Sequence, residues 1–433
     1  MLWAVIFTVS PMVLAAQGIF SPYTIQGIGD VNSNALINNL GAGGVGISNG
    51  EAWHLNTLNP ALLPQNTFTV FEMGLGLDVR NISGLAGSQQ NTSGELAYVN
   101  LGIPLKVNKW TMALGIRPYS TINYQVGTVD STTFADTRIT SIFEGSGGLT
   151  DLNVSMGYKL VEGVAIGGRG SFLFGPMRRE ATIIADNSIN NQQSLIDQVT
   201  VSDLQFGGGL SFYKILYDKG DTPKDSTKAK NSVVLRPKWR FNAGLTYDLE
   251  ADLDGTRFRA SENRNQFDRL ISSDTILLDA PGSVLIPGKV GFGIGMERVN
   301  TWSLELNYTT QDWTKYRNFD GAVSNLSSAW AWRFGGSLTP DYQSVTSYFS
   351  RVTYRLGAKL ERSPYMINNT PIDDFGINFG MSLPLSGLSS LDMAFQYGVR
   401  GESTPGIVKE DYFKVYLGVT LNDVPWKKRP IYN

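Results

Sequence analysis

The feature that most constrains this chain is a period-two pattern that recurs from Thr67 almost to the C-terminus. In about fourteen runs, large apolar residues occupy every second position, and small, polar or charged residues lie between them. Each run is close to the ~9–11 residues that a tilted strand needs to cross an outer membrane. The run at residues 69–79 is typical, with Phe71, Met73, Leu75 and Leu77 alternating with Glu72, Gly74, Gly76 and Asp78. The pattern indicates strands with one face toward lipid and one toward a polar interior.

Strands in hydrocarbon must form a closed sheet, because every backbone N–H and C=O group needs a protein partner there. A barrel of about fourteen strands has a bore too wide for its own side chains to fill. Residues 17–66 precede the first run, do not alternate, and are rich in Gly, Asn and Ser. We therefore expect an all-β fold, a transmembrane antiparallel β-barrel of about 14 strands over residues 67–422. Residues 17–66 are expected to form an N-terminal plug, or hatch, in the lumen.

The connections between the runs alternate between short and long ones, as they do in transmembrane barrels with short periplasmic turns and long external loops. Short connections are expected near Lys106, Glu162, Arg298 and Gly387. The long, polar ones are residues 128–147, 178–198, 251–281 and 361–373.

Residue usage excludes several kinds of site. The 433-residue chain has no cysteine, which rules out disulfides, thiolate metal ligands and a cysteine nucleophile. Its single histidine, His54, rules out a multi-histidine metal site, and a net charge of −2 gives no sign of nucleic-acid binding. Residues 41–46 fit G-x-G-x-x-G but lie between polar segments, so we assign no dinucleotide cofactor. We expect no enzyme activity, no metal and no cofactor. A phospholipase-type enzyme is disfavoured because His54 lies in the predicted plug.

Three segments are expected to lie outside the membrane wall. Residues 1–16 resemble a secretory signal peptide with an apolar stretch over residues 2–14. No basic residue precedes that stretch, which favours a truncated start, with a buried N-terminal strand as the alternative. Residues 218–230 are charged and are expected to form a periplasmic connection, and residues 423–433 a periplasmic tail.

The non-alternating stretch at residues 53–64 contains the triplet Asn59-Pro60-Ala61, and the third predicted strand is interrupted at Arg117-Pro118-Tyr119. This triplet, placed ahead of a whole-chain barrel pattern, resembles the hatch of the FadL-like outer-membrane transporters of hydrophobic compounds, in a Bacteroidetes-type form. The resemblance covers essentially the whole mature chain. It implies a fourteen-strand barrel with an N-terminal hatch, and an Asn-Pro-Ala triplet beside a kink in the third strand.

Pro118 has two interpretations, which the sequence leaves open. Because proline lacks a backbone N–H, a proline inside a barrel strand implies a bulge or a gap. In one interpretation Pro118 opens a lateral exit into the membrane beside the hatch. In the other, the membrane part of the strand ends at Ile116, and Pro118 begins an external loop.

Two sets of charged side chains are candidates for function in the lumen. His54 is a candidate for gating by protonation, since its ordinary pKa is near neutrality; the alternative is a hydrogen-bonded plug histidine. Four arginines on the polar strand faces are candidates for binding a carboxylate, for which Arg is well suited, and their alternative role is in salt bridges between hatch and wall. These residues are Arg169, Arg240, Arg333 and Arg355.

The sequence thus favours a multi-pass β-barrel of a Gram-negative outer membrane, in contact with its lipid. The function expected from the resemblance is passive uptake of a hydrophobic small molecule, such as a long-chain fatty acid or a detergent-like compound. The ligand would bind in an apolar pocket above the hatch and leave sideways. The alternative is a non-transport barrel of the same fold that acts in binding, assembly or secretion, like the PorV-type barrels of type IX secretion. That function would involve secretion-system or surface-protein partners.

Overall fold

The computed structural model describes residues 19–85, 87–131, 138–185, 192–219, 235–265, 267, 269–385 and 389–424. The predicted signal peptide at residues 1–16 lies outside the described residues. So do most of the predicted connection at residues 218–230 and most of the predicted tail at residues 423–433.

The described chain begins with short elements and continues as strands. The short elements are the 3-10 helix η1 (Pro22–Ile25), the strand β1 (Asp30–Val31), the helix α1 (Ile37–Gly41) and the 3-10 helix η2 (Pro60–Gln65). The strands that follow are β2 (Thr69–Gly84), β3 (Gly87–Lys106), β4 (Trp110–Pro118), β5 (Ser120–Ser131), β6 (Arg138–Gly147), β7 (Thr150–Val161), β8 (Val164–Ala185), β9 (Gln192–Lys219), β10 (Leu235–Asp248), β11 (Ala251–Arg264), β12 (Leu270–Ile286), β13 (Lys289–Arg298), β14 (Trp302–Asp312), β15 (Ser328–Leu338), β16 (Thr353–Ile367), β17 (Thr370–Pro384), β18 (Ser390–Arg400) and β19 (Lys409–Asp423). Two further 3-10 helices, η3 (Trp313–Lys315) and η4 (Phe349–Arg351), lie in connections.

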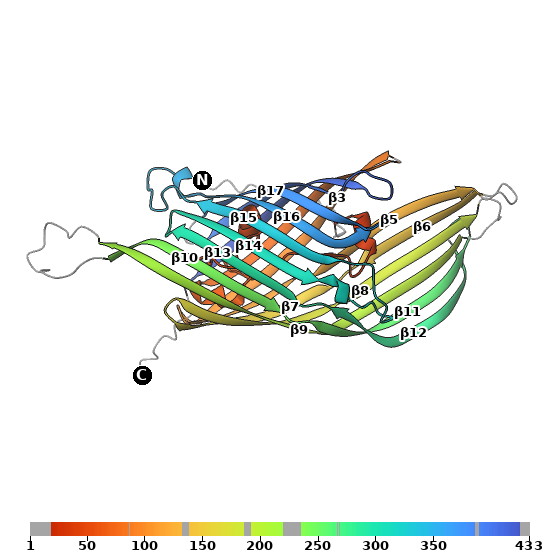
Figure 1. The fold of residues 1–433 in the computed structure, drawn as a ribbon, viewed down its shortest axis with the longest axis horizontal. Helices are drawn as coiled ribbons and strands as arrows, with labels where there is room; N and C mark the ends of the chain where they lie inside the picture. The colour runs from red at the N-terminus through yellow and green to blue at the C-terminus, as the bar shows by residue number, and fades with distance from the viewer. Residues whose placement is uncertain are drawn as a thin grey trace, which may run out of the picture.

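A closed antiparallel ring forms the wall of the molecule (Figure 1). Fourteen strands of the described chain follow one another around it, in the order β2, β3, β4, β7, β8, β9, β10, β13, β14, β15, β16, β17, β18 and β19. The ring closes where β19 pairs with β2, from Lys409 opposite Ser83 to Asp423 opposite Thr69. Closure pairs the strand edges with each other, as hydrocarbon requires. The predicted fold class, an antiparallel barrel of about 14 strands, is confirmed.

The outer face of the ring is apolar, and its inner face is polar. On β2, Phe71, Leu75 and Leu77 are 39%, 51% and 44% exposed, whereas Glu72 and Asp78 are 1% and 5% exposed. The exposed apolar side chains are those that lipid would cover, and the buried polar ones point into the ring. Among the described residues, no helix is long and apolar enough to cross a membrane.

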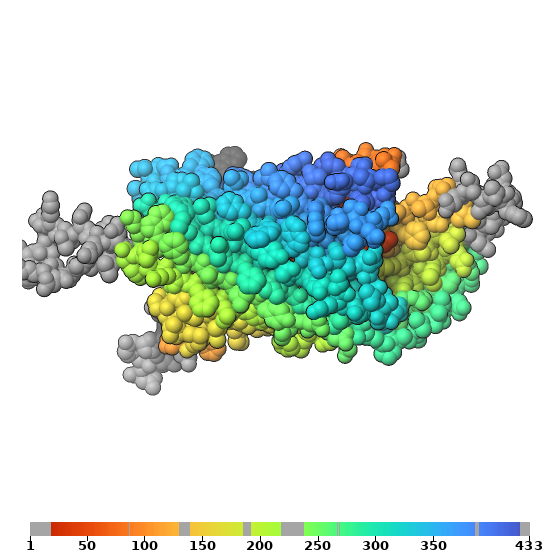
Figure 2. Space-filling view, in the orientation of Figure 1, coloured from red at the N-terminus to blue at the C-terminus, as the bar shows by residue number. Residues whose placement is uncertain are grey.

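The predicted long connections are largely strands in the structure, which corrects the sequence analysis. Residues 128–147, 178–198 and 251–281 belong mostly to β5, β6, β8, β9, β11 and β12, and residues 361–373 to the hairpin of β16 and β17. The first six pair as an open sheet that extends beyond the ring as a crescent (Figures 1 and 2). Some apolar side chains of these strands, such as Met177, Val199 and Leu253, are buried in one cluster, so the chain itself covers an apolar face of the crescent.

The wall is interrupted between β3 and β5. Residues 99–106 of β3 pair with β4, but residues 87–98 have a registered partner on one side alone, in β2. Beyond Pro118 the chain turns away from β3, and β5 pairs with β6 and with the two-residue strand β1. We call this interruption the wall gap.

Residues 19–66, which we call the N-terminal segment, lie against the inner face of the ring. Inward-facing glycines on strands around the whole circumference touch the segment so closely that a Cβ atom at any of them would overlap it. They are Gly102 on β3, Gly157 on β7, Gly167 on β8, Gly209 on β9, Gly244 on β10, Gly335 on β15, Gly357 on β16 and Gly380 on β17. The small residues on the polar strand faces therefore permit the N-terminal segment to pack against the wall.

We expect Gly335→Val to displace the N-terminal segment while the ring still forms, because the added Cβ overlaps the carbonyl group of Ala42. The control is Gly168→Val, since the nearest atom to a Cβ at Gly168 is 4.0 Å away, on Gly207. Hydrogen exchange at residues 37–47 should be at least roughly tenfold faster in the Gly335 variant alone. Equal protection in both variants would contradict this packing.

Candidate functional site

His54 lies in a buried charge network that joins the N-terminal segment to the wall. Its Nδ1 is 2.7 Å from Oε2 of Glu51, and its Nε2 is 3.2 Å from Oδ1 of Asp392 on β18. Arg355 on β16 donates to both oxygens of Glu51 at 3.3 Å. We call these four residues the histidine network. Removing one charge from such a buried network leaves its partners unpaired and typically costs about 3–5 kcal/mol.

The histidine network keeps its charges over a wide pH range. Burial alone would lower the pKa of His54, but the carboxylates of Asp392 and Glu51 outweigh burial and raise this pKa to about 10. Burial alone would raise the pKa of Glu51, but the guanidinium of Arg355 and the ring of His54 outweigh it and lower this pKa to about 2. The pKa of His54 thus lies above the neutral range in this arrangement, and gating by protonation of His54 stays a prediction.

A second buried network fastens the beginning of the N-terminal segment. Arg400 of β18 donates to both carboxylate oxygens of Asp30 at 2.7 and 2.8 Å. Its guanidinium carbon lies 4.9 Å from the ring centre of Tyr23 and 5.3 Å from that of Tyr365. Burial would raise the pKa of Asp30, but the charge of Arg400 outweighs it and lowers this pKa to about 2. Arg400, paired with Asp30 through two hydrogen bonds and lying near the rings of Tyr23 and Tyr365, thus fixes both the position and the orientation of this part of the N-terminal segment.

The Asn59-Pro60-Ala61 triplet forms the start of η2. Oδ1 of Asn59 accepts from the N–H of Ala61 at 3.0 Å, so Asn59 caps the helix, and Pro60 occupies the first helical position. Nδ2 of Asn59 donates to the carbonyls of Ile47 and of Leu210 on β9. These hydrogen bonds tie the triplet to the side of the wall formed by β9, and they do not reach the wall gap.

The predicted strand interruption at Arg117-Pro118-Tyr119 lies at the wall gap. Pro118 ends β4, and Arg117 donates to Asp151 of β7 at 2.6 Å. Across the gap, the N–H of Asn32 donates to the carbonyl of Tyr119 at 2.9 Å, and β1 pairs with the first two residues of β5. Residues 30–32 of the N-terminal segment therefore cover the edge of β5 here.

Three of the four predicted lumen arginines contact the N-terminal segment. The contacts are Arg169 with the carbonyl of Thr57, Arg240 with the side chain of Asn49, and Arg355 with Glu51. The fourth, Arg333, pairs with Glu361 on β16 and lines a cavity.

This cavity, of about 270 Å³, lies between the N-terminal segment and the wall. It is lined on both sides of the wall gap, by Glu95 and Tyr98 of β3 and by Pro118 and Thr121 of β4 and β5. Basic residues outnumber acidic ones in its lining, seven to four. The basic residues are Arg80, Lys289, Arg333, Lys359, Arg362, Arg400 and Lys414, and the acidic ones are Asp30, Glu95, Glu361 and Asp374.

Lys289, at the start of β13, differs from the other basic residues of the cavity. Each of the other six has a carboxylate oxygen within 4.0 Å. Lys289 has no such partner among the described residues. The alternation placed Lys289 on the polar face of its strand, but it gave no reason to separate this lysine from the paired charges. The sequence therefore did not reveal that Lys289 is the basic residue of the cavity lining without a carboxylate partner among the described residues.

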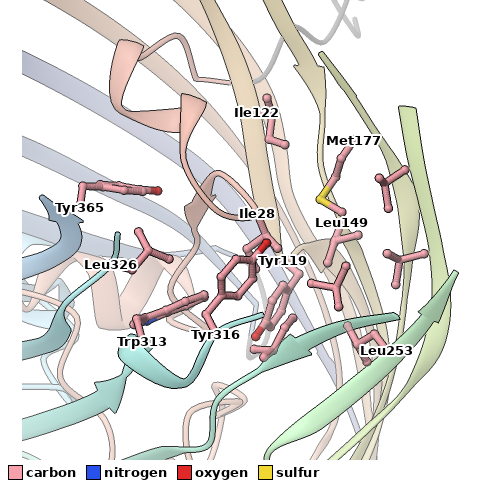
Figure 3. Packing of buried hydrophobic residues seen from close by; sticks show 14 of the residues in the cluster. Ile28, Tyr119, Ile122, Leu149, Met177, Leu253, Trp313, Tyr316, Leu326 and Tyr365 are labelled. Atoms are coloured by element: carbon pink, nitrogen blue, oxygen red, sulfur yellow. The ribbon is translucent and has the colours of Figure 1, made fainter. Parts of the chain in front are cut away.

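An apolar cluster fills the concave side of the crescent (Figure 3). Trp313 and Tyr316, in the connection after β14, gather there with Ile28, Tyr119 and Leu253. The apolar side chains of this cluster pack on one another. The cavity nearby is lined by apolar and charged residues together, so the apolar ligand pocket expected above the hatch stays a prediction.

Comparison with known proteins assigns the family. The model of the BamG family matches residues 1–433, the whole chain. The chain belongs to the BamG family. A search of curated protein sequences found no match.

Solved structures share the fold of this BamG-family chain at low sequence identity. A Pseudomonas aeruginosa FadL homologue is 12% identical, over 92% of this chain and 99% of its own, with a TM-score of 0.55. The P. putida toluene transporter TodX is 11% identical, over 92% and 100%, with a TM-score of 0.55. The CymD monoaromatic hydrocarbon channel is 13% identical, over 91% and 97%, with a TM-score of 0.54. The chain is thus an outer-membrane β-barrel of FadL-like fold, as predicted.

The histidine network should make the packing of the N-terminal segment depend on alkaline pH. The pKa of His54 in the folded chain, about 10, is above its ordinary value of 6.5. Its contribution to stability is therefore complete below about pH 6.5 and is lost as the pH rises toward 10.

We expect His54→Gln to speed hydrogen exchange at residues 50–58 at pH 6, relative to the wild-type chain. The difference should shrink between pH 7 and 10, after correction for the intrinsic exchange rate. A difference that stays constant up to pH 10 would show that the charge of His54 does not stabilise the segment.

Proposed function

We propose that this BamG-family barrel passes hydrophobic small molecules that carry an acidic group, such as long-chain fatty acids, across the outer membrane. The observation that carries the proposal is the position of the cavity, which borders the wall gap and is lined by Lys289, a lysine with no acidic partner among the described residues. The printed names of the structurally similar proteins, a toluene transporter and a monoaromatic hydrocarbon channel, agree with a hydrophobic cargo.

The cavity suits an amphiphile better than a hydrocarbon. An acidic head group would pair with Lys289 and with the guanidinium of Arg333, which already shares Glu361 with Lys359. The hydrocarbon tail would extend through the wall gap into lipid, so that it need not cross water. Pro118 contributes to this path by ending the pairing of β4 at the gap.

Passage requires the N-terminal segment to move near the wall gap. The histidine network and the triplet hold its later residues against β9, β16 and β18. Beside the gap, its contacts with β5 are the two-residue strand β1 and the hydrogen bonds of Asn32, and farther along β5 Ser21 and Thr24 bond to the backbone of Asn123. We propose that residues 31–33 shift while Asp30 stays paired with Arg400 and residues 47–66 stay in place, so that the bore remains closed as a plugged barrel.

The experiment compares the uptake of a labelled long-chain fatty acid with that of the fatty alcohol of the same length. We expect wild-type cells to take up both faster than cells that lack the gene. Lys289→Gln should lower uptake of the acid about tenfold, the usual effect of losing one charge-assisted contact, and leave the alcohol unaffected. Lys289→Arg, which keeps the charge, should retain uptake of the acid. Equal uptake of both compounds with and without the gene would remove the transport proposal.

A second candidate function, a binding or assembly role, is favoured by a ribbon at the end of the barrel where short turns join the strands. The hairpin of β9 and β10 continues to the pair Lys219–Leu235, beyond the last pairs of β9 with β8 and of β10 with β13. A two-stranded ribbon with two free edges is suited to pairing with another protein. If this role is correct, deletion of the gene should lower the levels of other outer-membrane or secreted proteins. The Lys289→Gln chain should then restore those levels.

A further inference from the structure

Two cations without acidic partners face the lipid at the short-turn end of the barrel. Gly291, Gly293 and Gly295 of β13 face the N-terminal segment, so the even-numbered residues of this strand, including Arg298, point outward. On β9 the same alternation places Lys214 outward, between the exposed Phe212 and Leu216. Both cations are exposed, and neither has a carboxylate partner among the described residues.

A pair of tryptophans lies beside these cations. Arg298 is directly opposite Trp302 of β14. On the other side of β13, Arg240 of β10 is opposite Glu297, so the next residue of β10 outward, Trp239, is level with Arg298. The two indole rings pack edge to face, with centroids 5.3 Å apart. Lys214 is opposite Phe241, two residues from Trp239. Because β10 separates β9 from β13 and the two cations are offset by two residues along the strands, the backbones of Lys214 and Arg298 are about 12 Å apart, and their long side chains can reach one group between them.

The position of this cluster in the membrane follows from its side chains. Tryptophan is enriched where lipid meets water, and lysine and arginine near that boundary extend their charges toward the head groups. Short turns mark the periplasmic end of transmembrane barrels. An unpaired cation on the lipid-facing wall is costly unless an anion meets it there. The anion available at this boundary is a lipid phosphate.

We propose that Lys214, Arg298, Trp239 and Trp302 form a binding site for a phospholipid of the periplasmic leaflet. The phosphate binds between the ammonium of Lys214 and the guanidinium of Arg298, which can hold two phosphate oxygens at once. The indole pair packs against the glycerol and the first methylenes of the acyl chains. This site faces away from the lumen and is independent of any passage through the barrel.

The test is native mass spectrometry of the full chain purified in detergent, titrated with phosphatidylglycerol. The wild-type chain should retain bound lipid, and the double variant Lys214→Gln, Arg298→Gln should bind about tenfold more weakly. The matched control is Arg351→Gln, which removes an exposed charge at the same end of the barrel, over Tyr348 and away from the tryptophan pair. It should bind lipid as the wild type does.

Three outcomes would overturn the site. They are equal binding by the double variant, an equal loss in the Arg351 control, and a wild-type preference for lipid A over phospholipid. If the double variant does not fold, as judged by circular dichroism, the single variants Lys214→Gln and Arg298→Gln decide the question. Each should weaken binding severalfold, and unchanged binding in both would equally exclude the site.

Discussion

The architecture depends on the close approach between the backbone of the N-terminal segment and the inward-facing glycines of the wall. Because no side chain separates the two, the segment can follow the inner face of the ring from β17 around to β3. Its backbone donors are then met by polar side chains of the wall. Glu72 accepts from the N–H of Leu55, Glu305 from that of Ser48, and the hydroxyl of Tyr98 from that of Ile37. These three backbone donors of the N-terminal segment are thereby paired, as buried polar groups require.

The charged side chains between the N-terminal segment and the wall differ in whether an opposite charge pairs with them, and this difference bears on function. The histidine network and the pair of Arg400 with Asp30 are buried, multiply bonded and charged over a wide pH range, so they act as fixed attachments. Lys289 of β13 lines the cavity that reaches the wall gap, and among the described residues it has no such partner. A cation that the fold leaves uncompensated in this cavity distinguishes a binding region from the structural ion pairs around it.

The sequence predicted the wall well and the site incompletely. Alternation over residues such as 69–79 is imposed by lipid on one face and the lumen on the other, so it predicted membrane strands and their number. It failed for β5, β6, β11 and β12, because strands of the crescent bury apolar side chains in a cluster that the chain itself covers. The triplet at Asn59 was expected beside the third strand; η2, which the triplet begins, contacts that strand, β4, and the hydrogen bonds of Asn59 reach β9. Which wall strand a lumen segment meets depends on the path of the segment through the bore, and local pattern carries no information about that path.

The sequence by itself determined that this chain forms a closed barrel with a non-alternating N-terminal segment left over, because backbone hydrogen bonding in hydrocarbon permits no open sheet. It also supplied the glycines and charges of the inner face. The tertiary structure decided which charges neutralise one another. Arg355 and Glu51 are 304 residues apart and Arg400 and Asp30 are 370 residues apart, so neither pairing follows from spacing. An ion pair needs its two charges within a few ångströms of each other, and only the folded ring brings these groups that close, while Lys289 is left without a carboxylate partner among the described residues.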